Sequence, residues 1–146
     1  MTLESDQISG SHPVPDVQLQ RCGGGTVNPA DFVGHELVVL FPPEEGRIAA
    51  RELKDYGSRL AELDKIDAWL LAICDGSELQ PTNGLVIVHD ANGSAWQAMT
   101  ECAGAQATLS RDQGAAFVFG RGGSLQKAFA GPGRVAEVLE ELRRRR

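Results

Sequence analysis

Residues 37–74 decide the fold of this chain and read LVVLFPPEEGRIAARELKDYGSRLAELDKIDAWLLAIC. An apolar run at each end of this stretch predicts two strands that are buried on both faces. Between the runs, apolar residues recur at steps of four and three, which predicts one amphipathic helix over residues 46–63. Its apolar stripe comprises Ala49, Leu53, Tyr56, Leu60 and Leu63, and the charged residues between them, including Glu52, are expected to face solvent.

The order strand–helix–strand over this length predicts two parallel neighbouring strands joined by a right-handed crossover. Phe41 and Cys74 end the two apolar runs, so both are expected at the carboxyl edge of the sheet. Open α/β folds place their functional sites at that edge. Glu44 and Glu45 open the helix at the same edge, where negative charge is favourable.

The segment before this unit predicts a β-hairpin. Residues 14–20 alternate apolar and polar side chains, as in a half-buried strand, and Thr26-Val27 begins the return after a glycine-rich turn. Asn28 followed by Pro29 predicts a capped helical turn. Residues 1–13 are expected to form a loose tail, and residues 14–146 one domain.

The segment after the unit predicts a strand over 84–89 and a short helix capped by Ser94 and Gln97. A second hairpin is predicted around Gly120-Arg121-Gly122-Gly123, because two apolar runs flank this turn sequence. Gly131-Pro132-Gly133 then precedes a final helix, whose basic end at Arg143–Arg146 complements the negative end of the helix dipole.

Composition excludes several classes of protein. The chain has 146 residues, 42% of them hydrophobic, with a formal net charge of −6. This length and composition fit one globular domain, and the acidic balance argues against a nucleic-acid partner. No 18-residue apolar run or signal-like N-terminus is present, so we expect no membrane segment and a cytoplasmic location. In that compartment the three cysteines are expected as free thiols.

Several stretches together carry a resemblance to a known family. They are 38–43 (VVLFPP), 51–53 (REL), 70–75 (LLAICD) and the late hairpin with 116–119 (AFVF) and 122–125 (GGSL). Over residues 14–142 their order resembles the thioredoxin fold as elaborated in peroxiredoxins of the alkyl hydroperoxide reductase and thiol-specific antioxidant type. The resemblance implies an α/β fold, namely a three-layer α/β/α sandwich with a central mixed sheet and an N-terminal β-hairpin.

The resemblance also implies where a reactive cysteine belongs. Counted back from Glu52, the family's cysteine falls at Ala49 or its neighbour Ala50, and a thioredoxin-type Cys-x-x-Cys falls at Gly46 and Ala49. None of these positions holds sulfur, and the threonine of the family's loop is also missing. Gly114-Ala115-Ala116 stand where thioredoxins carry a cis-proline and peroxiredoxins often an arginine. A catalytic thiol needs a lowered pKa at a helix N-terminus, and alanine offers no thiol there.

The remaining candidates are few. Cys74 is the candidate for a relocated redox or ligand-contacting thiol, with burial as a small apolar residue as the alternative. Cys102 lies on an apolar helix stripe and is expected in the core, while Cys22 beside three glycines is expected at the surface. His12, His35 and His89 lack metal-ligand spacing, so we expect neither a metal nor another cofactor.

Three hypotheses follow. The first is a redox-inactive, degenerate peroxiredoxin domain that binds a protein or small-molecule partner at the carboxyl edge. The second is an unconventional thiol-dependent peroxidase or oxidoreductase that uses Cys74. The third is an accessory domain that serves in assembly and forms a homodimer, similar to the thioredoxin-like domain appended to some flavin-dependent aromatic hydroxylases.

Overall fold

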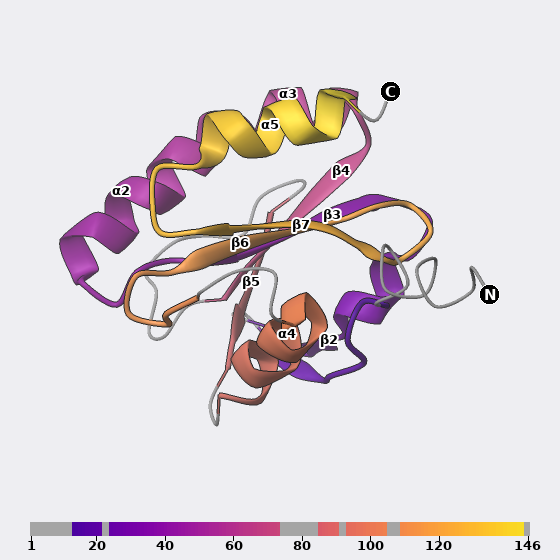
Figure 1. The fold of residues 1–146 in the computed structure, drawn as a ribbon, viewed down its shortest axis with the longest axis horizontal. Coiled ribbons are helices and arrows are strands. Elements are labelled where there is room, and N and C mark those ends of the chain that lie inside the picture. Colours follow the sequence, from indigo (N-terminus) through magenta and orange to yellow (C-terminus); the bar gives the residue numbers. More distant parts are fainter. Residues whose placement is uncertain (1–12, 22–23, 74–84, 91–92, 105–108, 145–146) are drawn as a thin grey trace.

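Seven strands form one mixed sheet in the part of the chain that the structure, a computed structural model, describes: residues 13–21, 24–73, 85–90, 93–104 and 109–144. The strand order is β2-β1-β5-β4-β3-β6-β7 (Figure 1). Strands β3, β4 and β5 are parallel, and the others are antiparallel to their neighbours. The strands are β1 (Leu19–Arg21), β2 (Thr26–Val27), β3 (Glu36–Phe41), β4 (Ala68–Ile73), β5 (Leu85–His89), β6 (Ala115–Phe119) and β7 (Leu125–Ala130).

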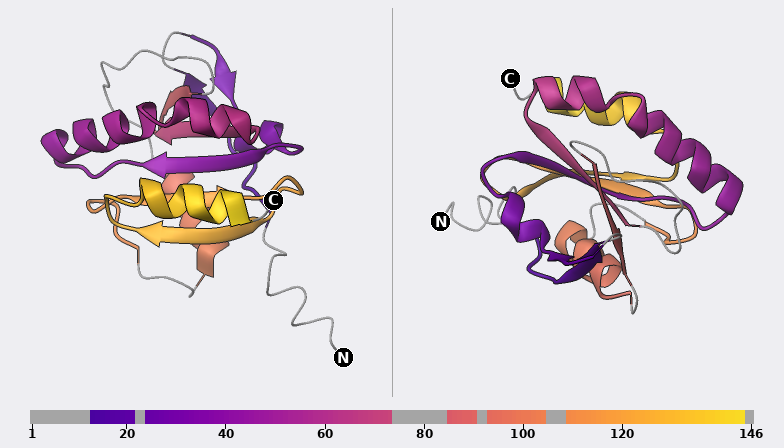
Figure 2. Two further views of the ribbon diagram at one scale, coloured as in Figure 1. Left: turned by 90° about the horizontal axis from the view of Figure 1, so that it is seen from above. Right: turned by 180° about the vertical axis from the view of Figure 1, so that it is seen from behind.

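Helices cover both faces of this sheet. Viewed from above, α2, α3 and α5 lie side by side over one face (Figure 2), and α4 lies on the other (Figure 1). The predicted α/β/α sandwich with a mixed sheet and an N-terminal hairpin is therefore confirmed. None of the described helices is long and apolar enough to cross a membrane. The helices are η1 (Pro29–Phe32), α2 (Gly46–Gly57), α3 (Leu60–Lys65), α4 (Ser94–Ala103) and α5 (Val135–Arg144).

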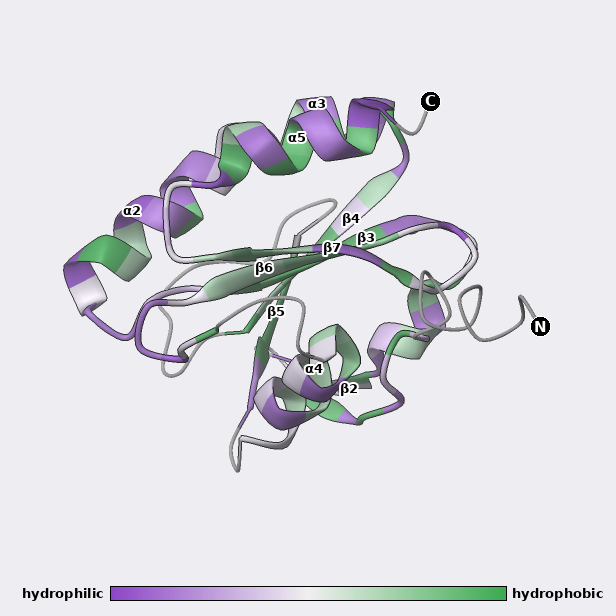
Figure 3. Cartoon of the chain, viewed as in Figure 1, coloured by the Kyte–Doolittle hydropathy of each residue, from purple (hydrophilic) through white to green (hydrophobic). Residues whose placement is uncertain are grey.

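Strand β3 divides the core into two halves. All six of its residues are buried, and their side chains alternate between the faces, as the two-residue period of a strand requires. Leu37, Val39 and Phe41 pack on the α4 side. Val38 and Leu40 pack against α2, α3 and α5. The central strands are mostly hydrophobic (Figure 3), and the burial of all six residues of β3 confirms the apolar run as a strand buried on both faces.

The predicted helix over 46–63 is in fact two helices. Strands β3 and β4 are parallel neighbours as predicted, but the crossover breaks after Gly57. There the Ser58 hydroxyl donates to the carbonyl of Asp55 at 2.8 Å, so a side chain satisfies a carbonyl at the helix end. Glycine at the break disfavours continuation of the helix, which is why the periodic pattern alone overestimated its length.

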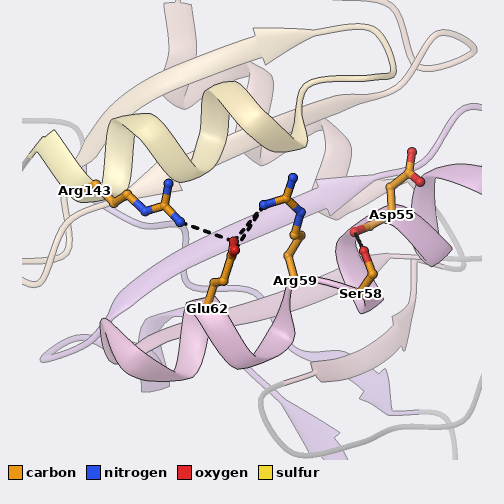
Figure 4. Close-up of polar contacts among 5 residues, drawn as sticks. All are labelled: Asp55, Ser58, Arg59, Glu62 and Arg143. Carbon is orange, nitrogen blue, oxygen red and sulfur yellow. Dashed lines mark hydrogen bonds and ion pairs between the residues drawn. The ribbon is translucent and has the colours of Figure 1, made fainter.

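Ion pairs join the second part of the crossover to the last helix. Glu62 of α3 lies 2.8 Å from Arg59 and 3.3 Å from Arg143 of α5 (Figure 4). The Arg59 hydrogen bond is the main reason that the pKa of Glu62 is lowered. Because these side chains are well exposed, each pair adds little stability, but the shared carboxylate links α3 to α5.

Glu52 is buried, contrary to its predicted place on the solvated face of the helix. Its side chain is only 4% exposed, and its carboxylate accepts a hydrogen bond from the backbone N–H of Gly133 at 2.9 Å. Gly133 lies just before α5, so the contact fastens α2 to the start of the last helix. Burial is the main cause of the raised pKa of Glu52, and the nearby Asp55 adds to it.

Tyr56 lies one turn further along α2 and is also buried. Its ring is 1% exposed, and its hydroxyl has no hydrogen-bond partner among the described residues. Burial, with the charges of Glu52 and Glu137, raises the pKa of this hydroxyl. The ring therefore stabilises the interface of α2 with the sheet through apolar contact. Burial of its unpaired hydroxyl lowers the stability of the folded state.

Two further local predictions were wrong. The first strand begins at Leu19 rather than at residue 14, because Pro15 lacks the N–H that a ladder requires and Val14 instead donates to Gly123. Helix α4 is not capped by a box of Ser94 and Gln97. The carboxylate of Asp90 accepts from the N–H groups of Ala95 and Trp96, both at 3.0 Å, and so takes the capping role.

The capped turn at Asn28 and the hairpin around residues 120–123 are confirmed. The Asn28 side chain accepts from the N–H of Ala30, with Asp31 completing the capping box. The N–H of Gly120 donates to the carbonyl of Ser124, which closes the turn between β6 and β7. This loop joins two strands, as predicted, and does not precede a helix.

Gly114 fastens the start of β6 to the end of β3. Its φ is +83°, and a Cβ there would lie 2.5 Å from the carbonyl oxygen of Phe41 and 2.9 Å from the nitrogen of Pro43. Only glycine allows this approach of two backbones. Glu44 donates its N–H to the carbonyl of Asp112 at 3.0 Å beside it. The loop before β6 is thus held against the segment that leads into α2.

Replacing Glu52 by glutamine tests its burial. The pKa of Glu52 in the folded protein is raised above its ordinary value of 4.5. The buried, protonated carboxyl therefore contributes fully to the free energy of unfolding below pH 4.5, and this contribution is lost as the pH rises through the folded-state pKa. Glutamine keeps an acceptor for Gly133 and stays neutral. We expect Glu52→Gln to match wild type in urea unfolding near pH 4 and to be more stable near pH 7. A variant that is less stable at neutral pH would contradict this assignment.

Two glycine substitutions separate steric contact from backbone strain. Gly114 and Gly93 both have a positive φ, but nothing lies within 4 Å of a Cβ at Gly93. We expect Gly93→Ala to cost about 1 kcal/mol, from strain alone. Gly114→Ala must also displace the backbone at Phe41 and Pro43, so we expect a loss of roughly 3 kcal/mol or more in the free energy of unfolding. Equal losses in thermal or urea unfolding would show that the close approach does not matter.

Candidate functional site

The carboxyl ends of β3 and β4 lie side by side, as the sequence predicts. Leu40 is paired with Ala72, so Phe41 and Ile73 end the two strands at the same edge. Cys74 is the next residue, and it lies outside the described residues. We use the name carboxyl-edge surface for Glu45, the exposed residues of the first two turns of α2, and Arg111, which lies against the buried Phe41 and Pro42.

The first turn of α2 is capped by the chain's own carboxylate. Glu45 is the N-cap residue, and its carboxylate accepts from the N–H groups of Arg47 at 3.3 Å and Ile48 at 3.1 Å. The prediction that acidic residues here serve the helix N-terminus is confirmed for Glu45. These N–H groups carry the positive end of the helix dipole, where an anion is stabilised. Part of this anion-binding capacity is therefore already used.

Ala49 lies in the same turn, at the position that the resemblance assigns to a reactive cysteine. Its N–H donates to the Glu45 carbonyl at 2.9 Å, as in any regular helix, and its methyl group is half-buried. A methyl group can neither donate, accept nor attack. A helical turn of this kind can lower the pKa of a thiol. Here the position of the thiol is taken by a methyl group, and the Glu45 carboxylate already accepts from the N–H groups of the turn.

Arg111 covers the end of β3 from the neighbouring loop. Its Nη1 donates to the carbonyl oxygen of Pro42 at 2.7 Å, and its guanidinium lies 5.4 Å from the centre of the Phe41 ring. The contact is both a hydrogen bond to a buried proline and a cation–π interaction. It ties the loop before β6 to the loop before α2.

Aromatic rings fill the space beneath this arginine. Trp96 of α4 meets Phe41 edge to face at 5.0 Å between ring centres, and Phe41 meets Phe117 at 5.8 Å in the same way. Phe41 and Phe117 are fully buried. Such edge-to-face packing is favourable for aromatic quadrupoles and leaves a solid apolar base under the carboxyl-edge surface.

Sequence reasoning missed Arg111 and Trp96. The expected place of an arginine before Phe117 holds Gly114-Ala115-Ala116, and Arg111 reaches the site from three residues further upstream. The pairing of Phe41 with Ala115 brings that loop to the edge, and no local pattern reveals this register. A search for any cation within a few residues of the strand start could have found Arg111.

The other candidate residues lie away from the carboxyl-edge surface or outside the described residues. His35 is paired with Asp67 at 3.0 Å, near the amino ends of β3 and β4. Cys102 is buried as predicted: its thiol donates to the carbonyl of Pro13 at 3.4 Å, and burial raises its pKa to about 11. His12 and Cys22 lie outside the described residues. Within those residues, no three His, Cys, Asp or Glu side chains gather as a metal site.

The outer part of the carboxyl-edge surface is the exposed beginning of α2. Residues 44–48 are all exposed, and Ile48 is one of two large apolar side chains that the described surface exposes, at 41%. In Figure 2, seen from above, this end of α2 extends beyond the tip of β3. The edge therefore presents a projecting helical turn above a filled interior.

Comparisons with known proteins agree with this architecture. No protein-family model matches the sequence, and no curated protein matches it. Among solved structures, peroxiredoxin Q of Xanthomonas campestris is similar with a TM-score of 0.71 and 18% identity, over 90% of this chain and 93% of that one. The mitochondrial 2-Cys peroxiredoxin of Plasmodium falciparum gives 0.71 and 14% identity, over 90% of each chain.

Thioredoxins are similar as well. The exposed lipoprotein thioredoxin Etrx1 of Streptococcus pneumoniae gives a TM-score of 0.60 and 16% identity, over 89% of this chain and 99% of that one. At such identities the likeness concerns the fold. The chain has a thioredoxin fold of the peroxiredoxin-like form, as the sequence resemblance implied.

Proposed function

We propose that this protein is a redox-inactive member of the thioredoxin-fold group, which acts by binding a protein partner at the carboxyl-edge surface. One observation carries the proposal. At the position that the sequence resemblance assigns to a reactive cysteine, Ala49 stands in a helical turn whose amides are capped by Glu45.

The Glu45 carboxylate makes thiol chemistry at this turn unfavourable in two ways. It occupies two N–H groups that would stabilise a thiolate, and its negative charge opposes a second anion nearby. An anionic substrate meets the same obstacle. Because Glu45 also caps the helix, the carboxylate has a structural reason to remain in place.

A protein partner fits the surface better than a small ligand. The side chains of Phe41 and Phe117 fill the interior beneath this surface. Arg111 lies over the Phe41 ring, and its Nη1 donates a hydrogen bond to the carbonyl oxygen of Pro42. A small molecule needs a concave, largely enclosed site. The exposed turn with Ile48 instead offers a projecting apolar side chain, which suits burial against another protein.

The alternative is a thiol-dependent peroxidase or oxidoreductase that uses Cys74. The end of β4 beside β3 is the observation that favours it, since Ile73 precedes this cysteine at the carboxyl edge. The two proposals differ in whether the protein consumes peroxide.

Peroxide consumption by wild type and by Cys74→Ser separates these proposals. We expect equal and negligible turnover of hydrogen peroxide and an organic hydroperoxide by both proteins, with dithiothreitol or a thioredoxin system as reductant. Cys102→Ser serves as a control, because its thiol is buried with a raised pKa. Turnover by wild type that is lost in Cys74→Ser alone would refute redox inactivity.

A cysteine placed at Ala49 tests the effect of Glu45. In a Cys22→Ser/Cys74→Ser background, we expect Ala49→Cys to react slowly with iodoacetamide at neutral pH. Adding Glu45→Ala frees the N–H groups of Arg47 and Ile48, so the rate should rise roughly tenfold, as for a fall of one unit in thiol pKa.

Glu44→Ala is the matched control for this experiment. It removes the same charge from the neighbouring exposed residue, whose side chain does not cap the helix. Equal acceleration by Glu44→Ala and Glu45→Ala would show that general charge, and not the capping geometry, governs the site.

A further inference from the structure

One face of α2 carries a row of cations. Arg47, Arg51 and Lys54 are spaced i, i+4 and i+7, so their side chains share one face of the helix over about 10 Å of its axis. All three are exposed. The opposite face packs on the sheet through Glu52, Leu53 and Tyr56, so the row faces away from the core. We name Arg47, Arg51 and Lys54 the α2 cation row.

The α2 cation row has no ion-pair partner among the residues that the structure describes. No ion pair or hydrogen bond holds any of its three side chains in the described structure. Cations of the neighbouring helices differ. Arg59 and Arg143 share Glu62 (Figure 4), and Arg134 and Arg144 lie within 4 Å of Glu137 and Glu141. The row thus presents three positive charges on one exposed helix face, and none of them forms an ion pair among the described residues.

We infer that the α2 cation row, with Ile48 beside it, recognises an acidic segment of a partner protein that has an apolar side chain next to its carboxylates. This inference rests on the proposed function and names the partner's chemistry. Ile48 follows Arg47 on α2 and is 41% exposed, so a partner that neutralises the row can bury an apolar group at the same time. The three cations of the row would provide specificity and speed up association with the partner, and the contact with Ile48 would provide binding affinity.

The charges around the row favour an acidic protein segment over a nucleic acid. Glu44, Glu45 and Asp55 flank the three cations, and the whole chain is acidic, so a long polyanion would be repelled on either side. A short acidic helix avoids this, because carboxylates at i, i+4 and i+7 match the row in both number and length. Its apolar residue would meet Ile48 at the side of the row.

Fluorescence anisotropy with a labelled peptide tests the inference. The probe is an alanine-based helical peptide with Glu at i, i+4 and i+7 and one adjacent Leu, and its counterpart carries Gln in place of Glu. We expect full-length wild type to bind the Glu peptide at about 0.05 M salt, more weakly at about 0.5 M, and to bind the Gln peptide at least tenfold more weakly.

Two triple variants of equal net charge provide the decisive comparison. Arg47→Gln/Arg51→Gln/Lys54→Gln removes the row, and Arg21→Gln/Lys65→Gln/Lys127→Gln removes three exposed cations elsewhere. We expect the first to weaken binding of the Glu peptide at least tenfold and the second to leave it within about twofold. Glutamine suits a helix, and circular dichroism confirms that both variants fold.

The outcomes separate this inference from the proposed function. Equal effects of the two triple variants, equal binding of the Glu and Gln peptides, or no binding of the Glu peptide by wild type would overturn the inference. Tighter binding of a labelled DNA duplex than of the Glu peptide would overturn it too. In each case the absence of peroxide turnover would leave the proposed function standing, and turnover through Cys74 would remove that function whatever the peptide does.

Discussion

The burial of β3 on both faces and both edges is the constraint on which the rest of the structure depends. The strand pairs with β4 on one side and β6 on the other, and its side chains enter both halves of the core. Every backbone group of such a strand must be paired and every side chain must be apolar or partnered. The position of its last residue, Phe41, then fixes where α2 begins and which loop lies against it.

That constraint explains how the carboxyl-edge surface is built. Gly114 lets the start of β6 approach the Phe41 carbonyl, and Arg111 bonds to Pro42 from the same loop. Glu45 caps the helix that follows. Each of these groups contacts the protein's own backbone or rings. The hydrogen bonds of Arg111 and Glu45 are thus made within the protein, in keeping with the proposal that this turn has no thiol chemistry.

Charge on the α2 side of the sheet is distributed unevenly. At α3 and α5, Arg59, Arg143 and Arg144 each form an ion pair with a glutamate of these helices. Along α2, two carboxylates bond to the backbone instead: Glu45 to the helix amides and Glu52 to Gly133. The α2 cation row faces solvent. The proposed acidic partner would supply the ion pairs that the arginines of the neighbouring helices form within the protein.

The sequence by itself determined the strand–helix–strand unit, both hairpins and the last helix, because these depend on local periodicity and turn chemistry. The sequence resemblance also predicts that Ala49, or its neighbour Ala50, stands where the family holds a cysteine, and this stays a prediction. Tertiary structure alone decided that Glu52 is buried and that Arg111 covers Phe41. Glu52 depends on Gly133 and Arg111 on the β3–β6 register, both far along the chain. Asp90 instead bonds α4 amides five and six residues away, a local contact that the predicted capping box did not include. A charged side chain is assigned to solvent by local pattern, and only a distant backbone donor or acceptor can bring it inside.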